Sequence, residues 1–170
     1  MEKLIEEGGS AVGGRPIKQE EVPEIIEKVN ELLISLGLEQ HEDFDAVGSA
    51  GKKKVEDESG DIDFIVNRKK VAEVLGVAGS TPIEIVTALK NKMEELGFYA
   101  IQNNGLKVVS FAMPFKSDDD LIQIDLIIAG SMEFSRFFQT SPDYRNDESK
   151  YKSNIRNIFL MTISSTIARR

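Results

Sequence analysis

The chain has 170 residues, of which 41% are hydrophobic and 29% are charged, and its formal net charge is -8. This length and balance predict one globular domain with a proper core, and the acidic charge argues against strong bulk binding of nucleic acid. The sequence has no cysteine and one histidine, which excludes disulfides and thiol catalysis and leaves oxygen ligands for any metal site. No apolar run is long enough for a membrane span and no signal peptide is recognisable, so we expect no membrane partner and a cytoplasmic location.

The N-terminal part of the chain contains a glycine-rich segment followed by the first helical pattern. Residues 1–19 are expected to form a flexible arm, or alternatively a lid in which backbone amides and Arg15 contact substrate phosphates. Residues 20–170 are expected to form a single domain. Its first element is an amphipathic helix over 20–36, because apolar residues recur there every three or four positions and Gly37 provides a stop.

One stretch carries the most informative pattern. A short strand at 44–47 leads into Gly48-Ser49, and a mostly polar loop of eleven residues separates this turn from Asp61-Ile62-Asp63. Because side chains alternate along a strand, Asp61 and Asp63 should share one face, while their apolar neighbours face the core. Two adjacent carboxylates repel each other unless a cation lies between them. The pattern therefore predicts a site for a divalent metal, Mg²⁺ or Mn²⁺.

The middle of the chain alternates helical and strand patterns. A short helix is expected at 71–75, and a capping box at 81–84 begins a second amphipathic helix that ends at Gly97. Strands at 98–102 and 106–113 flank an Asn-Asn-Gly turn, which is a strong hairpin signal. These elements predict a sheet with amphipathic helices packed on it.

A third aspartate lies inside the apolar strand at 121–129. Asp125 shares a face with Gln123, and the apolar residues occupy the other face. An ionised carboxylate in such a strand is unfavourable unless it is paired with a lysine or arginine or bound to a metal. The aspartate run at 118–120 is more typical of a solvated turn. Asp125 is therefore the residue expected to join the other strand aspartates.

Two further helices are expected near the end of the chain, at 132–139 and 149–168. Three cations lie close to the start of the second one: Lys150, Lys152 and Arg156. Cations at a helix N-terminus oppose the helix dipole, so their placement needs a reason. Anion binding is one explanation, and salt bridges to nearby acidic residues are the other.

The order hydrophobic-Gly-Ser, eleven residues, Asp-Ile-Asp-Phe and a later strand aspartate resembles the signature of the DNA polymerase β-like nucleotidyltransferase superfamily. The resemblance covers residues 44–129. It implies an α+β fold, with a mixed, largely antiparallel sheet of about five strands and helices mainly on one face. Many members carry an arginine shortly after Gly-Ser, whereas this chain has Ala50-Gly51-Lys52, which leaves the phosphate contact to a lysine or to a distal residue.

The resemblance implies a metal-dependent transfer of a nucleoside monophosphate from an NTP to an acceptor hydroxyl on an RNA end, a small molecule or a protein. Asp61 and Asp63 would bridge two Mg²⁺ or Mn²⁺ ions, and Asp125 would complete the site of the ion that activates the hydroxyl. Gly48 and Ser49 would bind the β- and γ-phosphates. Four cations are our own additions as nucleotide-binding candidates: Lys52, Lys150, Lys152 and Arg156.

The ends of the chain are also similar to predicted nucleotidyltransferases encoded by tailed phages, which would place the protein in the host cytoplasm. Four short motifs carry this similarity: Glu7-Gly8-Gly9, Ser141-Pro142-Asp143, Ser149-Lys150-Tyr151-Lys152 and Arg156-Asn157.

Two other interpretations remain. Haloacid-dehalogenase-like phosphatases and many sugar-nucleotide glycosyltransferases also use an Asp-x-Asp pair, but place it after an apolar strand. Here the pair precedes the apolar run 64–66, which disfavours both classes. The remaining alternative is a non-catalytic nucleotide-binding or structural module that retains the fold.

Overall fold

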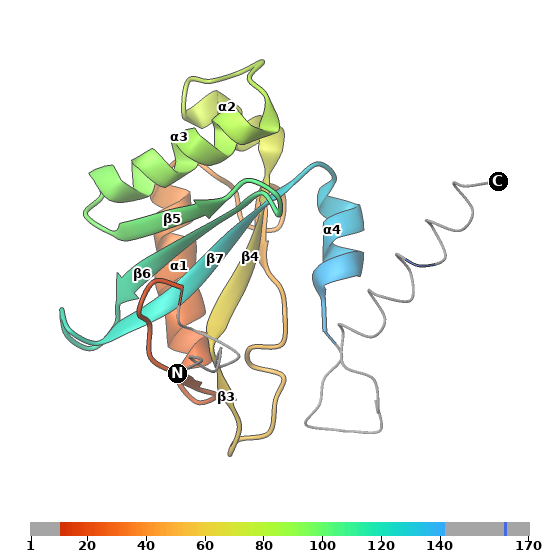
Figure 1. The fold of residues 1–170 in the computed structure, drawn as a ribbon. Coiled ribbons are helices and arrows are strands. Elements are labelled where there is room, and N and C mark those ends of the chain that lie inside the picture. The colour runs from red at the N-terminus through yellow and green to blue at the C-terminus, as the bar shows by residue number, and fades with distance from the viewer. Residues whose placement is uncertain (1–10, 142–161, 163–170) are drawn as a thin grey trace.

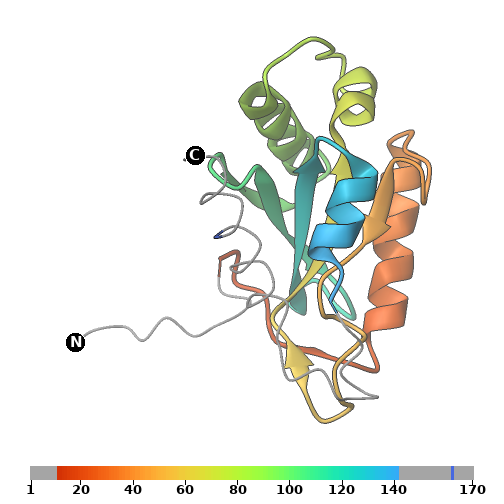
Figure 2. The same ribbon diagram turned by 90° about the vertical axis from the view of Figure 1, so that its right-hand side faces the viewer.

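The computed structural model describes residues 11–141 and Thr162, and Figures 1 and 2 show its fold from two directions. Four helices lie within these residues: α1 (Val22–Ser35), α2 (Arg68–Val74), α3 (Pro82–Glu95) and α4 (Met132–Gln139). The strands are β1 (Ile17–Lys18), β2 (Phe44–Ala46), β3 (Glu58–Ser59), β4 (Asp61–Asn67), β5 (Tyr99–Asn103), β6 (Val108–Pro114) and β7 (Leu121–Ala129). Among the described residues, no helix has both the length and the apolar character needed to cross a membrane.

The central feature is a five-stranded sheet with the order β2-β4-β7-β6-β5. Strands β4 and β7 pair in parallel, while the other neighbouring strands pair antiparallel. The expected α+β class with a mixed, largely antiparallel sheet is thus confirmed. A separate two-stranded sheet formed by β1 and β3 was not expected from the sequence, because each strand has only two residues.

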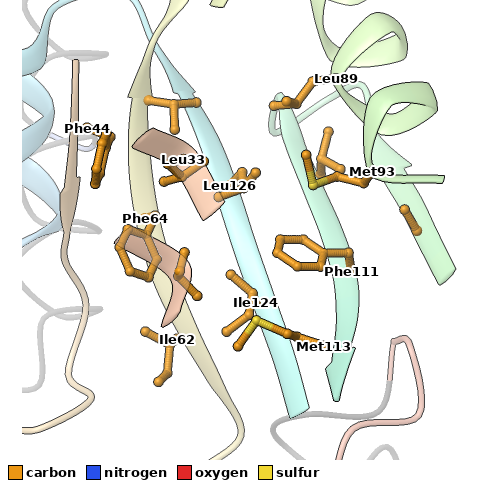
Figure 3. Close-up of a cluster of buried hydrophobic side chains, with 14 of the residues drawn as sticks. Leu33, Phe44, Ile62, Phe64, Leu89, Met93, Phe111, Met113, Ile124 and Leu126 are labelled. Atoms are coloured by element: carbon orange, nitrogen blue, oxygen red, sulfur yellow. The ribbon is translucent and has the colours of Figure 1, made fainter. Parts of the chain in front are cut away.

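One face of the large sheet carries the main core, which is covered by α1, α2 and α3. Figure 3 shows how Phe64, Leu126 and Phe111 project from the three central strands towards Leu33 of α1 and Met93 of α3. All five side chains are fully buried or nearly so. Strict alternation in β4, β7 and β6 produces this face, so the polar residues between the apolar ones must lie on the other face.

The second face of the sheet, called here the open face, carries Asp61, Asp63 and Ile65 of β4. Helix α4 stands apart from the other three helices, on the far side of β4 in Figure 1. It packs Met132 against a small apolar cluster that includes Ile65 and Ala129. The expectation of helices mainly on one face is met by α1, α2 and α3, and α4 is the helix that adjoins the open face.

Residues 11–19 do not form the flexible arm that the sequence predicts for 1–19. Val12 and Ile17 are buried, and the Arg15 N–H donates to the Leu121 carbonyl at 2.8 Å. Gly14 lies so close to β7 that a Cβ atom on it would be 2.6 Å from the backbone nitrogen of Gln123. These contacts fix the segment to the start of β7. Residues 1–10 lie outside the described part of the chain.

The side chain of Arg15 is engaged in an ion-pair cluster. It pairs with Glu21 at 2.8 Å and with Asp120, while Lys116 also pairs with Glu21. The expected lid function, in which Arg15 contacts phosphates, is therefore not what the structure shows. Asp120 acts as a structural partner of Arg15, which explains one member of the aspartate run without a metal.

Local signals in the middle of the chain are mostly confirmed. Thr81 caps α3 through its hydroxyl, which accepts from the Glu84 N–H at 3.4 Å, and the Glu84 carboxylate accepts from the Thr81 N–H at 2.6 Å. The hairpin between β5 and β6 forms as expected, but its residue with positive φ is Lys107 at 57°. Glycine at 105 is therefore not the residue that supplies the left-handed conformation of this turn.

Candidate metal centre

Three aspartates meet on the open face where β4 and β7 run side by side. Asp61 and Asp63 are two residues apart on β4, so both project from the same face. The parallel register places Asp125 of β7 directly opposite Asp63. One carboxylate oxygen from each residue lies within 4.8 Å of the others, and all three residues are half-buried. The convergence that the sequence predicts is present in the structure.

The electrostatics of this cluster are unfavourable without a cation. Burial, and after it the neighbouring charges of Asp61 and Asp125, raises the pKa of Asp63 to about 7. Burial also raises the pKa values of Asp61 and Asp125 above their ordinary range. Three carboxylates are thus held together although their mutual repulsion and desolvation oppose ionisation.

Other groups of the protein offset only part of the unfavourable burial and repulsion of these carboxylates. The Lys53 charge lowers the pKa of Asp61, and hydrogen bonds from Ser110 and Gln123 lower that of Asp125, but burial outweighs these effects. Within residues 11–141, Asp125 forms no ion pair with a lysine or arginine, so the salt-bridge explanation is not supported there. An all-oxygen set of converging carboxylates matches the ligands that Mg²⁺ and Mn²⁺ prefer. The residues present therefore fit a divalent metal ion.

Gly48 packs directly against the cluster. Its φ angle is +73°, and a Cβ atom added to it would be only 2.3 Å from Oδ2 of Asp63. Its N–H donates to the Gln139 carbonyl at 3.1 Å, and its own carbonyl accepts from the Ser141 N–H at 3.2 Å. The Gly48 N–H is therefore engaged with the end of α4, and the expected phosphate contact of Gly48 stays a prediction. What Gly48 provides here is space for the Asp63 carboxylate.

We expect Gly48→Ala to impair the metal centre more than it impairs the fold. The new methyl group would displace the Asp63 carboxylate, and the positive φ adds strain of roughly 1 kcal/mol. The matched control is Gly76→Ala, because Gly76 has a φ of +70° but open space around its Cβ position. Mn²⁺ affinity, measured by titration, should fall at least about tenfold in Gly48→Ala and stay unchanged in Gly76→Ala. Equal affinities in the two variants would contradict the steric role of Gly48.

The turn after Gly48 lies beside the cluster, and the expected phosphate contacts of its residues stay predictions. Ser49 accepts a hydrogen bond from the Lys52 N–H at 3.1 Å, which closes the turn. The ammonium of Lys52 lies 3.4 Å from the Gly48 carbonyl. Three other nucleotide-binding candidates, Lys150, Lys152 and Arg156, lie outside the described residues, as do the expected helix at 149–168 and the motifs at 7–9, 142–143 and 149–157.

The position of α4 is fixed by contacts that the sequence does not reveal. Arg136 forms an ion pair with Asp45 of β2 and donates to the His41 carbonyl. The His41 ring nitrogen Nδ1 lies 2.7 Å from Asp45 as well. A short parallel bridge then joins Thr140 to Gly48. These contacts place the end of α4 alongside the turn that borders the metal centre.

Comparison with protein-family models and with curated proteins gives no match for this chain. The arrangement of its own residues therefore carries the functional argument.

Proposed function

We propose that this chain is a metal-dependent nucleotidyltransferase with a polymerase β-like fold. The observation that carries the proposal is the convergence of Asp61, Asp63 and Asp125 on the open face, next to the Gly48-Ser49 turn. A Gly-Ser turn followed by paired strand aspartates and a third aspartate on an adjacent strand is the arrangement that this superfamily resemblance implies. The mixed sheet with parallel β4 and β7 is compatible with it.

In the proposed reaction, an acceptor hydroxyl attacks the α-phosphorus of an NTP, and the bond to the β-phosphate oxygen breaks. A nucleoside monophosphate is transferred, pyrophosphate leaves, and the hydroxyl proton is released to solvent. Divalent cations, when bound, stabilise the attacking and leaving oxygens of such a displacement. The three aspartates would hold them, because no other group of three acidic or histidine residues converges in this way among residues 11–141.

Several residues near the cluster are suited to an anionic substrate. Ser49 offers a hydroxyl in the turn beside Asp63, and Lys52 lies on the same turn. Lys53 acts on Asp61 electrostatically, so its charge is felt at the cluster. These residues take the place of the arginine that many superfamily members carry after Gly-Ser.

The proposed activity is tested by incubating the protein with each NTP labelled at the α-phosphate, in Mg²⁺ or Mn²⁺, together with pooled RNA or cell extract. We expect label to appear in an acceptor and to disappear when EDTA is added. Transfer that survives the double substitution Asp61→Ala with Asp63→Ala would contradict the proposal. So would the complete absence of transfer under every condition, which would favour the non-catalytic module.

The non-catalytic alternative makes a distinct expectation. A binding module would show saturable NTP binding, measured by equilibrium dialysis, without release of pyrophosphate. The half-buried position of three mutually repelling carboxylates argues against a purely structural role, since apolar or neutral side chains would stabilise the same strands better.

A further inference from the structure

Gln123 occupies an unusual position beside the metal centre. It lies two residues before Asp125 on β7, projects from the open face, and pairs in register with Asp61. Only 4% of the residue is exposed. Gly14 packs closely against its backbone and Cβ, since a Cβ on Gly14 would be 3.2 Å from the Cβ of Gln123. The side chain is therefore enclosed between the N-terminal segment and the aspartates.

The nitrogen and the oxygen of the Gln123 amide differ in their hydrogen bonding. Nε2 donates to Oδ1 of Asp125 at 3.0 Å. Oε1 is buried and has no hydrogen-bond partner among the described residues. Exchanging the two ends would place an amide oxygen against a carboxylate oxygen, so the contact with Asp125 fixes the orientation. An acceptor buried without a donor is unfavourable, so this atom calls for an explanation.

The surroundings restrict what the missing donor can be. Ionised carboxylates accept hydrogen bonds and cannot donate them, so the aspartates beside Gln123 do not supply one when they hold a cation. Mg²⁺ and Mn²⁺ sites in proteins usually retain several bound waters, whose hydrogens point outwards to neighbouring acceptors. Such outer contacts orient the ligands and commonly change metal affinity by 10–100-fold.

We propose that Gln123 is a positioning residue of the metal centre: its amide nitrogen holds Asp125, and its Oε1 accepts a hydrogen bond from a water bound to the cation. This inference rests on the proposed cation site. It adds a residue that contacts a metal ligand and a metal-bound water without binding the metal itself. It assigns a function to a glutamine that the carboxylate pattern alone leaves unexplained.

The test is a titration of the metal-free protein with Mn²⁺ at pH 8. The concentration of unbound Mn²⁺ is measured at each step from its electron paramagnetic resonance signal. Gln123→Met removes both amide contacts at similar size. Gln123→Glu keeps an acceptor oxygen but loses the donor to Asp125. Gln102→Met is the matched control, because Gln102 is a glutamine of β5 whose amide contacts Thr87 and Asn104.

We expect Gln123→Met to weaken Mn²⁺ binding by 10–100-fold. Gln123→Glu, which loses the donor to Asp125 but keeps an acceptor oxygen, should weaken binding less than Gln123→Met, and Gln102→Met should leave it unchanged. The melting temperature of metal-free Gln123→Met should be equal to or above that of the wild type, because a buried acceptor without a partner has been removed. A purely structural glutamine would give the opposite pattern, a lower melting temperature with unchanged Mn²⁺ affinity.

The outcomes separate this inference from the function it rests on. If the wild type binds Mn²⁺ and the affinity of Gln123→Met is within twofold of the wild-type affinity, the assigned function of Gln123 is wrong. The proposed metal centre is then still supported. If Gln123→Glu loses as much affinity as Gln123→Met, the lost contact with Asp125 accounts for the whole effect, and the acceptor contact of Oε1 is wrong. If the wild type itself binds no Mn²⁺, both the metal centre and the function of Gln123 are overturned.

Discussion

Replacing Asp63 by asparagine is expected to reduce NTP-dependent label transfer by about a thousandfold or more. Asp63 is two residues from Asp61 on β4 and pairs in register with Asp125, and its pKa is raised the most of the three. Asparagine keeps the shape of the side chain but removes a charge that the cations need. A loss of several kcal/mol of transition-state stabilisation corresponds to roughly this factor, at about 1.4 kcal/mol for each tenfold change. Initial rates with saturating Mg²⁺ and NTP provide the measurement.

The matched control for this variant is Asp118→Asn. Asp118 is an exposed member of the aspartate run between β6 and β7, away from the three-carboxylate cluster. The control should transfer label at the wild-type rate. If Asp63→Asn retained more than about a tenth of the wild-type rate, the carboxylate cluster would not be the catalytic centre, whatever the control showed.

The second large effect concerns the dependence of stability on pH in the absence of metal. In the folded protein the pKa of Asp63 is about 7, whereas its ordinary value is 3.8. Between these values the folded state binds more protons than the unfolded state, so stability falls as pH rises from about 4 to about 7. The shift corresponds to at most about 4 kcal/mol, and therefore to roughly 10 °C in melting temperature for a chain of this size.

Melting curves in EDTA at pH 5 and pH 8 measure this effect, with Asp63→Asn as the comparison. The variant should be more stable than the wild type at pH 8, because asparagine has no charge to desolvate, and this difference should be smaller at pH 5, where Asp63 of the folded protein is protonated. Saturating Mn²⁺ should restore the wild type at pH 8 and leave the variant largely unchanged. The raised pKa of Asp63 would be contradicted if, in EDTA, the wild type gained stability relative to the variant between pH 5 and pH 8.

Asp61 and Asp125 also have raised pKa values, so they change stability with pH in the same direction as Asp63, whereas Glu21 acts in the opposite direction. The pKa of Glu21 is lowered from 4.5 to about 2, chiefly by its hydrogen bond to Arg15. Its contribution to stability is therefore present above about pH 4.5 and is lost as pH falls towards 2. Glu21 therefore makes stability rise with pH, whereas Asp63 makes it fall, and the effect of Glu21 lies at lower pH.

The parts of the structure that the sequence predicts well are those set by local periodicity. The expected strand at 121–129 agrees with β7 at both ends, and the capping box at Thr81 begins α3. Alternation along β4 and β7 was enough to place the aspartates on one face. Their convergence was predictable because strand aspartates among apolar residues have few stable alternatives.

Features that depend on contacts between distant segments were not predictable. The packing of residues 11–19 against β7 depends on Gly14 fitting beside Gln123. The engagement of the Gly48 N–H by Gln139 depends on where α4 ends, which Arg136 and Asp45 determine. Nothing in local composition specifies such pairs, because the register of a sheet and the docking of a helix arise only in the complete fold.

Gln123 illustrates how a residue of the site is overlooked. In the sequence it is one polar residue in a strand. Its spacing of two residues from Asp125 predicts only that both side chains lie on the same face of that strand. Its enclosure, its contact with Asp125 and its unpartnered Oε1 appear only when β7 is placed against β4 and the N-terminal segment. Ser110 of β6 is similar, since only the register places it opposite Asp125.

The most direct test of the metal centre is a crystal structure of the protein soaked with Mn²⁺ and a non-hydrolysable NTP analogue, with anomalous scattering used to locate the metal. We predict at least one Mn²⁺ peak bound by carboxylate oxygens of Asp61, Asp63 and Asp125, with the triphosphate of the analogue in contact with the same ion. A nucleotide bound elsewhere, with no Mn²⁺ peak at these three aspartates, would contradict the proposed function.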